Sequence, residues 1–250
     1  MEQLDRLIRF PQCFKDQIEV AIKKCEGVNQ FNSWLKRFDQ LTNGIADESV
    51  TYRQVEDHVF ELKVMCFLLD TKEGVKITYE PKGIDPKGKD CDLLAETASC
   101  KYLIELKCTH PEMRDAEIPH EYITKNNKLY MNGGYYHLYQ SARGHLMDVT
   151  RHTEEKIANY GDGYKTVLAT IDGFHLDLED LRDFVFIYRL HAHRPDDPLG
   201  KMTMHNLKEP YNRTIDQFWA LPFHQDGFDF KPDRKPTIVA PLKSGDVSLV

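Results

Sequence analysis

Apolar residues recur three or four positions apart along the N-terminal part of the chain. This spacing places them on one face of a helix, and it predicts helices within residues 4–10, 14–25 and 30–41. Asn43-Gly44 follows the third segment and is expected to break the helical pattern. Residues 1–48 are therefore predicted to form a helical extension.

A longer helix is predicted next, with Ser49 or Thr51 as its N-cap and an end near Leu69. Its apolar positions form a wide stripe, which indicates that neighbouring elements cover much of this helix. The stripe consists of Val55, Val59, Leu62, Cys66 and Leu69, flanked by Phe60, Val64, Met65, Phe67 and Leu68.

Shorter apolar segments bounded by turn residues follow and indicate β-structure. The predicted strands are residues 75–81, 91–96, 101–108, 164–171 and 183–191. Residues 135–160 are predicted to be rich in helix. Beyond Pro195 the chain is rich in Pro, Gly and aromatic residues with weak periodicity, which predicts an irregular segment.

The order of these elements predicts an α/β protein with a central mixed sheet flanked by helices. The length of 250 residues suits one large domain with an appendage. We expect a helical extension (1–48), a core domain (49–194) and a C-terminal appendage packed on the core (195–250).

Composition narrows the class of protein. Apolar residues make up 41% and charged residues 29% of the chain, as is ordinary for a soluble globular protein. No apolar run resembles a signal peptide or reaches the roughly 20 residues that span a bilayer. The six cysteines form no CxxC pair, which favours reduced thiols over a structural zinc site. We therefore expect a cytoplasmic protein without a membrane partner.

The formal net charge of −7 argues against a strongly basic, unspecialised nucleic-acid binder. It is compatible with an enzyme that confines its basic residues to one groove, because net charge reports on steering and solubility and not on the chemistry of a site.

Charged residues interrupt the strand predicted at residues 101–108. Side chains alternate along a strand, so Glu105 and Lys107 project from one face while Ile104 and Leu106 project from the other. A carboxylate and an ammonium on a buried strand are unfavourable unless they are paired or bind a ligand. Asp92 lies across a short hairpin, and its carboxylate is expected to approach Glu105.

Two carboxylates at close range repel each other, and a divalent cation removes that repulsion. Mg²⁺ suits such a pair, because it takes hard oxygen ligands, keeps several waters and is completed by a substrate phosphate. We expect Mn²⁺ to substitute for it. Lys107 would orient or help to deprotonate an attacking water and would offset the negative charge.

The pattern Asp92…Glu105-Leu106-Lys107, with its flanking segments DLLAE and YLIELK, resembles the PD-(D/E)xK nuclease superfamily. That superfamily includes restriction endonucleases, Holliday-junction resolvases and many phage-defence nucleases. The resemblance covers roughly residues 50–175, and Cys91 stands where the name of the motif has Pro. It implies a restriction-endonuclease-like core and Mg²⁺-dependent hydrolysis of phosphodiester bonds, in DNA rather than RNA, by a restriction, repair or defence endonuclease.

The resemblance also implies further residues at the metal. It adds Leu106, between the Glu and the Lys of the motif, and a Glu from the preceding helix, for which Glu61 matches best and Glu56 second. Asp90 or Asp85 could replace the Asp of the motif as a ligand, but both lie in a predicted turn.

Contacts to nucleic acid are expected from residues that follow the motif. The resemblance implies a Gln or basic residue near the site, for which Gln140, with Arg143 beside it, is a candidate, and Lys128 is a further basic candidate. A homodimer or a larger defence or repair complex is compatible with this function.

Two alternatives stay open. Glu105 and Lys107 could belong to an edge strand of a surface hairpin and face solvent. The chain could also be a catalytically inactive nucleic-acid-binding or protein-interaction module on the same fold, although the intact motif favours the enzyme.

Overall fold

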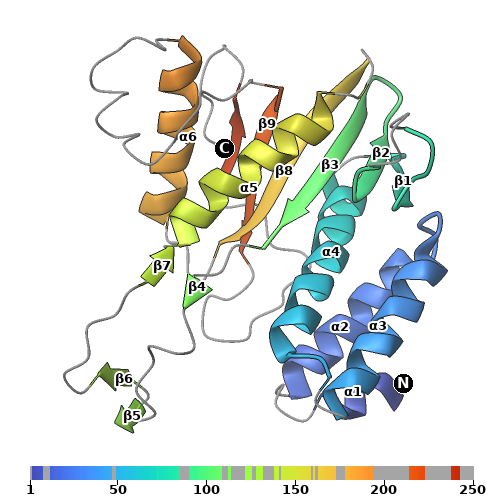
Figure 1. Cartoon of the computed structure of the whole chain (residues 1–250). Helices are drawn as coiled ribbons and strands as arrows, with labels where there is room; N and C mark the ends of the chain where they lie inside the picture. The colour runs from blue at the N-terminus through green and yellow to red at the C-terminus, as the bar shows by residue number, and fades with distance from the viewer. Residues whose placement is uncertain are drawn as a thin grey trace.

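Helices cover both faces of a six-stranded sheet in this mixed α/β protein (Figure 1). The computed structural model describes residues 2–7, 12–46, 49–71, 73–84, 90–108, 112–113, 122–125, 128–131, 138–140, 142–158, 160, 163–172, 178–193, 214–222 and 238–242.

The central sheet has the strand order β1-β2-β3-β8-β9-β10. Its strands are β1 (Lys76–Tyr79), β2 (Leu93–Glu96), β3 (Lys101–Lys107), β8 (Tyr164–Asp172), β9 (Gln217–Pro222) and β10 (Ile238–Pro241). The first three strands are antiparallel neighbours, β8 runs parallel to both β3 and β9, and β10 is antiparallel to β9. The strand with the Glu-x-Lys sequence, β3, is therefore an interior strand.

Two small sheets lie in the chain between β3 and the next helix. Strand β4 (Glu112–Met113) pairs with β7 (Leu138–Gln140), and β5 (Tyr122–Lys125) pairs with β6 (Lys128–Met131). Neither pair joins the central sheet.

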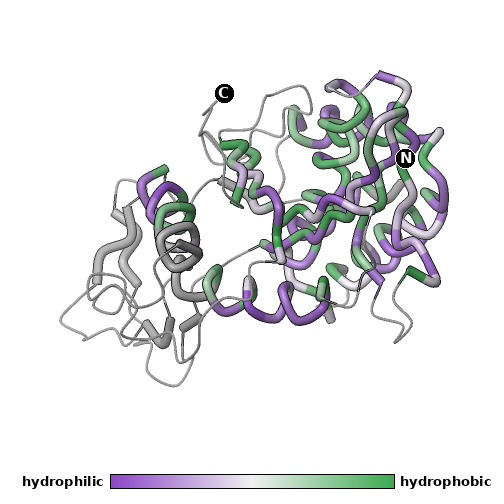
Figure 2. The backbone as a smooth tube through the Cα atoms, turned by 90° about the horizontal axis from the view of Figure 1, so that it is seen from above, coloured by the Kyte–Doolittle hydropathy of each residue, from purple (hydrophilic) through white to green (hydrophobic). Residues whose placement is uncertain are grey.

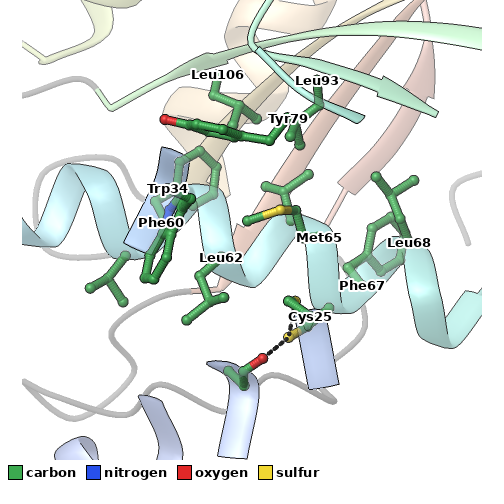
Figure 3. Close-up of a cluster of buried hydrophobic side chains, with 14 of the residues drawn as sticks. Cys25, Trp34, Phe60, Leu62, Met65, Phe67, Leu68, Tyr79, Leu93 and Leu106 are labelled. Carbon is green, nitrogen blue, oxygen red and sulfur yellow. Dashed lines mark hydrogen bonds between the residues drawn. The ribbon is translucent and has the colours of Figure 1, made fainter. Parts of the chain in front are cut away.

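Four N-terminal helices share a hydrophobic core with one face of the sheet. They are α1 (Glu2–Asp5), α2 (Gln12–Cys25), α3 (Phe31–Ala46) and α4 (Tyr52–Thr71). Ile104 and Leu106 of β3 point into this core, as the alternation of β3 predicted. Figure 3 shows Trp34, Phe60 and Met65 from the helices beneath these strands. The N-terminal helices thus belong to the main core of the protein.

The opposite face of the sheet is covered by α5 (Ala142–Ile157) and α6 (Leu178–His193). Leu168 and Phe218 point from β8 and β9 into this second core, where they meet Leu146 and Phe184. The rings of Phe184 and Phe218 pack with centroids 4.8 Å apart. Hydrophobic and hydrophilic residues alternate along the backbone, as elements with one buried face require (Figure 2).

The predicted break at Asn43-Gly44 was wrong, because α3 continues through it to Ala46. Gly44 does not end the helix; its missing side chain lets residue Val50 approach the helix closely. A Cβ at Gly44 would lie only 2.4 Å from Cγ2 of Val50, and the Val50 N–H donates to the Gly44 carbonyl at 3.0 Å. The returning chain therefore packs directly on the helix at this position.

Helix α4 begins with a reciprocal cap at Thr51, one of the two predicted N-caps. The Gln54 N–H donates to Oγ1 of Thr51 at 3.4 Å, and the Thr51 N–H donates to Oε1 of Gln54 at 2.8 Å. This arrangement satisfies backbone donors that the helix itself leaves free.

The C-terminal half departs from the predictions at three places. Residues 183–191 form part of α6 and not a strand. Residues 138–140, predicted to be helical, form β7. The segment after Pro195 is not wholly irregular, because β9 and β10 extend the central sheet and contribute to its core.

None of the helices in the described part of the chain combines the length and the apolar character needed to cross a lipid bilayer.

Candidate metal and catalytic site

The hairpin formed by β2 and β3 brings Asp92 and Glu105 to the same place in the sheet. Leu93 pairs with Ile104, so the next pair in this antiparallel register is Asp92 with Glu105. The Asp92 carboxylate accepts a hydrogen bond from the Leu106 N–H at 2.7 Å. Asp92 thus takes the place of a strand partner for β3, and its charge lies close enough to affect the ionisation of Glu105.

Glu105 is completely buried on the interior strand β3, on the face covered by α5 and α6. Nζ of Lys107 lies 3.6 Å from its Oε2, and Nζ of Lys156 lies 2.6 Å from its Oε1. A solvent-facing surface hairpin is therefore excluded for Glu105. Lys107 remains about one-third exposed, so it can reach both the buried carboxylate and solvent.

Lys156 and Tyr160 complete this cluster, and the sequence did not predict either of them. Lys156 stands in the last turn of α5, and Tyr160 lies just after the end of that helix. The Tyr160 hydroxyl donates to Oε1 of Glu105 at 3.4 Å. On the helix predicted within residues 135–160, a Lys and a Tyr four residues apart would share one face, and this was the available signal.

Burial, and after it the charge of Asp92, raises the pKa of Glu105 from 4.5 to about 7, although Lys107 and Lys156 oppose the rise. Burial alone would lower the pKa of Lys156, but the carboxylates of Glu105 and Asp92 raise it overall. Burial together with the charge of Asp92 outweighs the attraction of the lysines at Glu105, whereas the attraction of the carboxylates outweighs burial at Lys156.

Cys91 lies beside these charges, directly before Asp92. Burial, together with the negative charges of Glu105 and Asp92, raises the pKa of its thiol. The thiol donates to the Leu93 carbonyl at 3.2 Å. Cys91 is therefore a protonated, structural thiol at the edge of the cluster.

The donors in this cluster fit a divalent cation of the Mg²⁺ type. Oε2 of Glu105 is buried and accepts no hydrogen bond among the described residues, and its ion-pair partner Lys107 is 3.6 Å away, so this oxygen has room in its coordination for a cation. The N–H and C=O of one strand residue point to the same edge, so the Leu106 carbonyl points toward Asp92. Two carboxylates and a carbonyl are hard oxygen ligands. Within the described ranges, no group of three or more His, Cys, Asp or Glu side chains gathers, so the remaining ligands would be water or substrate.

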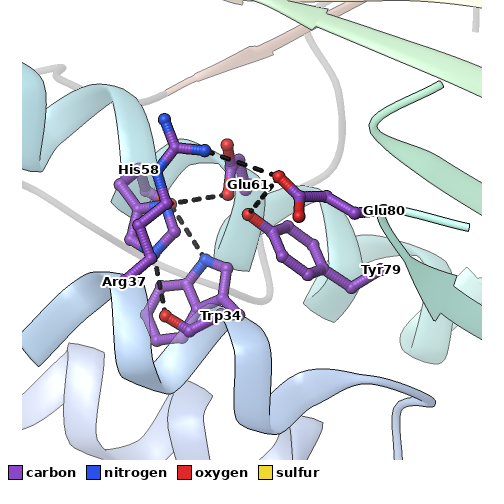
Figure 4. Close-up of polar contacts among 6 residues, drawn as sticks. All are labelled: Trp34, Arg37, His58, Glu61, Tyr79 and Glu80. Atoms are coloured by element: carbon purple, nitrogen blue, oxygen red, sulfur yellow. Dashed lines mark hydrogen bonds and ion pairs between the residues drawn. The ribbon is translucent and has the colours of Figure 1, made fainter. Parts of the chain in front are cut away.

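Glu61 lies in a different polar cluster, on the other face of the sheet. Figure 4 shows this cluster, which consists of Trp34, Arg37, His58, Glu61, Tyr79 and Glu80. Tyr79 is paired in register with Leu93, and Leu93 with Ile104, so Tyr79 points away from the face of Glu105. Burial, and then the charges of Glu61 and Glu80, raises the pKa of Tyr79.

Within this second cluster, Oε2 of Glu61 lies 2.9 Å from Nδ1 of His58, whose Nε2 lies 3.0 Å from the Trp34 carbonyl oxygen. The His58 ring is itself stacked on Trp34, with centroids 4.5 Å apart. These contacts connect α3 and α4, and they pair Glu61 with His58. The structure does not bring Glu61 together with Glu105.

Asp90, one of the alternatives to Asp92, closes the turn before β2. Its carboxylate accepts the N–H groups of Gly83 at 3.3 Å and Ile84 at 2.9 Å. Asp85 lies outside the described residues. Of the two alternatives, Asp90 thus has a structural role in the turn.

The residues predicted to contact nucleic acid cannot be placed relative to this cluster. Lys128 belongs to β6, Gln140 to β7 and Arg143 to α5, and their side chains lie outside the described part of the structure.

Comparisons with protein-family profiles, with curated proteins and with solved structures found no match to this chain.

Proposed function

We propose that the chain is a nuclease of the restriction-endonuclease-like class, which uses Mg²⁺ or Mn²⁺ to hydrolyse phosphodiester bonds in DNA. One observation carries the proposal. Glu105 is completely buried on an interior strand, where it lies next to Asp92 and between the ammonium groups of Lys107 and Lys156. Burial of such a charge is unfavourable for stability, and it is typical of a site that binds a ligand.

The order of the elements supports the fold assignment. Helix α4, the antiparallel strands β1 to β3, helix α5 and the parallel strand β8 follow each other along the chain. This is the order that the resemblance to the superfamily implies. Asp92 directly precedes the second of these strands, and Glu105 and Lys107 lie on the third.

In this proposal Asp92, Glu105 and the Leu106 carbonyl hold the cation. When bound, the cation polarises the phosphodiester and stabilises the charge that develops on phosphorus. Lys107 holds the attacking water through Nζ and can reach it because the side chain is partly exposed. Tyr160 orients the Glu105 carboxylate through its Oε1. Glu61 has no part in this set.

The test is cleavage of supercoiled plasmid, linear duplex and single-stranded DNA with Mg²⁺ or Mn²⁺. We expect the parent protein to cleave and Lys107→Ala to be inactive. Lys101→Ala is the matched control, because Lys101 lies on the same strand and its ion pair with Glu96, at 2.7 Å, is exposed. Equal cleavage by Lys107→Ala and the parent would refute the assignment. Metal-independent DNA binding without cleavage would favour an inactive binding module instead.

A further inference from the structure

Among the residues that the structure describes, Lys156 has the ammonium closest to Glu105, and it comes from a different layer of the protein. Its Nζ lies 2.6 Å from Oε1 of Glu105, whereas Nζ of Lys107 lies 3.6 Å from Oε2. The side chain of Lys156 is 22% exposed, and that of Glu105 is not exposed at all. The ammonium group is thus inserted from α5 into a site that β2 and β3 build.

The charges of the cluster balance without a metal. When both carboxyl groups are ionised, Asp92 and Glu105 supply two negative charges, and Lys107 and Lys156 supply two positive ones. A divalent cation on the carboxylates would add two charges a few ångströms from the Lys156 ammonium. Like charges at that range in a poorly solvated site repel strongly, so both cations cannot keep their best positions.

Lys156 can move away, whereas the carboxylate cannot. A lysine has a flexible four-carbon stem and a compact charge that is strongly hydrated. Its partial exposure gives the ammonium a route to solvent. Glu105 is fixed on an interior strand with neighbours on both edges.

We propose that Lys156 is a resident counter-ion of the Asp92–Glu105 pair, and that a divalent cation must displace its ammonium to bind. The inference rests on the proposed function, since it takes this pair as the metal site. It assigns Lys156 a regulatory part: it stabilises the metal-free protein and weakens the affinity for the cation.

The experiment is Mg²⁺ binding by titration calorimetry on the full chain, together with thermal unfolding in chelator and in Mg²⁺. Lys156→Met keeps the apolar stem and removes the charge. We expect it to bind Mg²⁺ at least about tenfold more tightly than the parent, which corresponds to about 1.4 kcal/mol more stabilisation at saturating metal. Its melting temperature in chelator should be lower than that of the parent, and the rise on adding Mg²⁺ should be larger.

Two controls separate charge from other effects. Lys156→Arg keeps the positive charge and should not tighten Mg²⁺ binding. Lys101→Met breaks an exposed ion pair at 2.7 Å from Glu96 on the same sheet and should leave the affinity unchanged.

The outcomes distinguish the two proposals. Mg²⁺ binding that Glu105→Gln abolishes, but that Lys156→Met weakens or leaves unchanged, would overturn the counter-ion role and keep the metal site. No Mg²⁺ binding by the parent and by Lys156→Met would overturn both. Binding by Lys156→Met tighter than that of the parent, and lost on adding Glu105→Gln, would support both.

Discussion

Replacing Glu105 by Gln should stabilise the metal-free protein while it abolishes metal-dependent cleavage. The side chain is completely buried, and its pKa is raised from 4.5 to about 7 by burial and by Asp92. Each unit of pKa corresponds to about 1.4 kcal/mol, so keeping this carboxylate ionised costs the folded state about 3 kcal/mol. Gln has the shape of the protonated acid and avoids that cost.

The sign of the pH dependence follows from linkage. The folded protein holds the Glu105 proton more tightly than the unfolded chain does. The stability that this proton contributes is therefore fully present below pH 4.5, and it is lost as the pH rises to about 7. The advantage of Glu105→Gln should therefore be absent at the acidic end of this range and reach about 3 kcal/mol above its upper end.

Urea unfolding in the presence of a chelator, repeated across this pH range, measures the difference directly. Glu96→Gln is the matched control, because Glu96 is a partly exposed carboxylate paired with Lys101 on the neighbouring strand. That variant should show no comparable gain. A Glu105→Gln protein less stable than the parent above pH 7 would refute the reasoning, since the ion pairs with Lys107 and Lys156 would then outweigh the burial.

Three further predictions concern other parts of the molecule. Lys107→Ala should lose cleavage while its free energy of unfolding changes by no more than about 1 kcal/mol, because the ion pair is long and partly exposed; plasmid cleavage and urea unfolding together test this. Gly44→Ala should lower the free energy of unfolding in urea by about 2 kcal/mol or more, since its Cβ would meet Val50. Gly27→Ala is the control, because a Cβ there has open space, and it should cause no such loss. Equal free energies of unfolding for the two variants would contradict the close approach at Gly44. Thr51→Ala removes a capping hydroxyl and should lower stability by about 1 kcal/mol by the same measurement, and an unchanged midpoint would count against the cap.

The proximity of Asp92 and Glu105 could be predicted from the sequence, because the hairpin that joins them is a local structure. Once the segments around Asp92 and Glu105 are read as consecutive antiparallel strands, the short connection between them fixes the register. The burial of Ile104 and Leu106 followed from the alternation along one strand. Local periodicity was sufficient for both inferences.

Lys156 could not be predicted in the same way. Its approach to Glu105 depends on where α5 crosses the sheet and how the helix is rotated, and both are properties of the packed core. Glu61 shows the reverse: its position on the preceding helix agrees with the resemblance, but its side chain joins His58 on the opposite face. The position of a residue along a helix does not by itself determine on which face of the sheet its side chain lies.

Residues 183–191 illustrate how packing overrides propensity. Their aromatic and branched residues favour a strand, yet Leu181, Phe184, Val185 and Tyr188 are buried at helical spacing against β8 and β9. The run was too short for periodicity to distinguish a buried strand from a buried helix. Two acidic residues at the start of the helix, Glu179 and Asp180, were the local signal for its N-terminus.

The strand order has a consequence for synthesis on the ribosome. Strand β8 pairs with β3 along one edge and with β9, which begins at Gln217, along the other. During translation, the apolar residues Val167, Leu168 and Ala169 therefore emerge long before the strand that protects them. An uncovered strand edge of this kind can pair with other chains. A nascent chain released before residue 217 would expose that edge next to the strand that carries Glu105, so β9 protects the sheet against pairing with other chains.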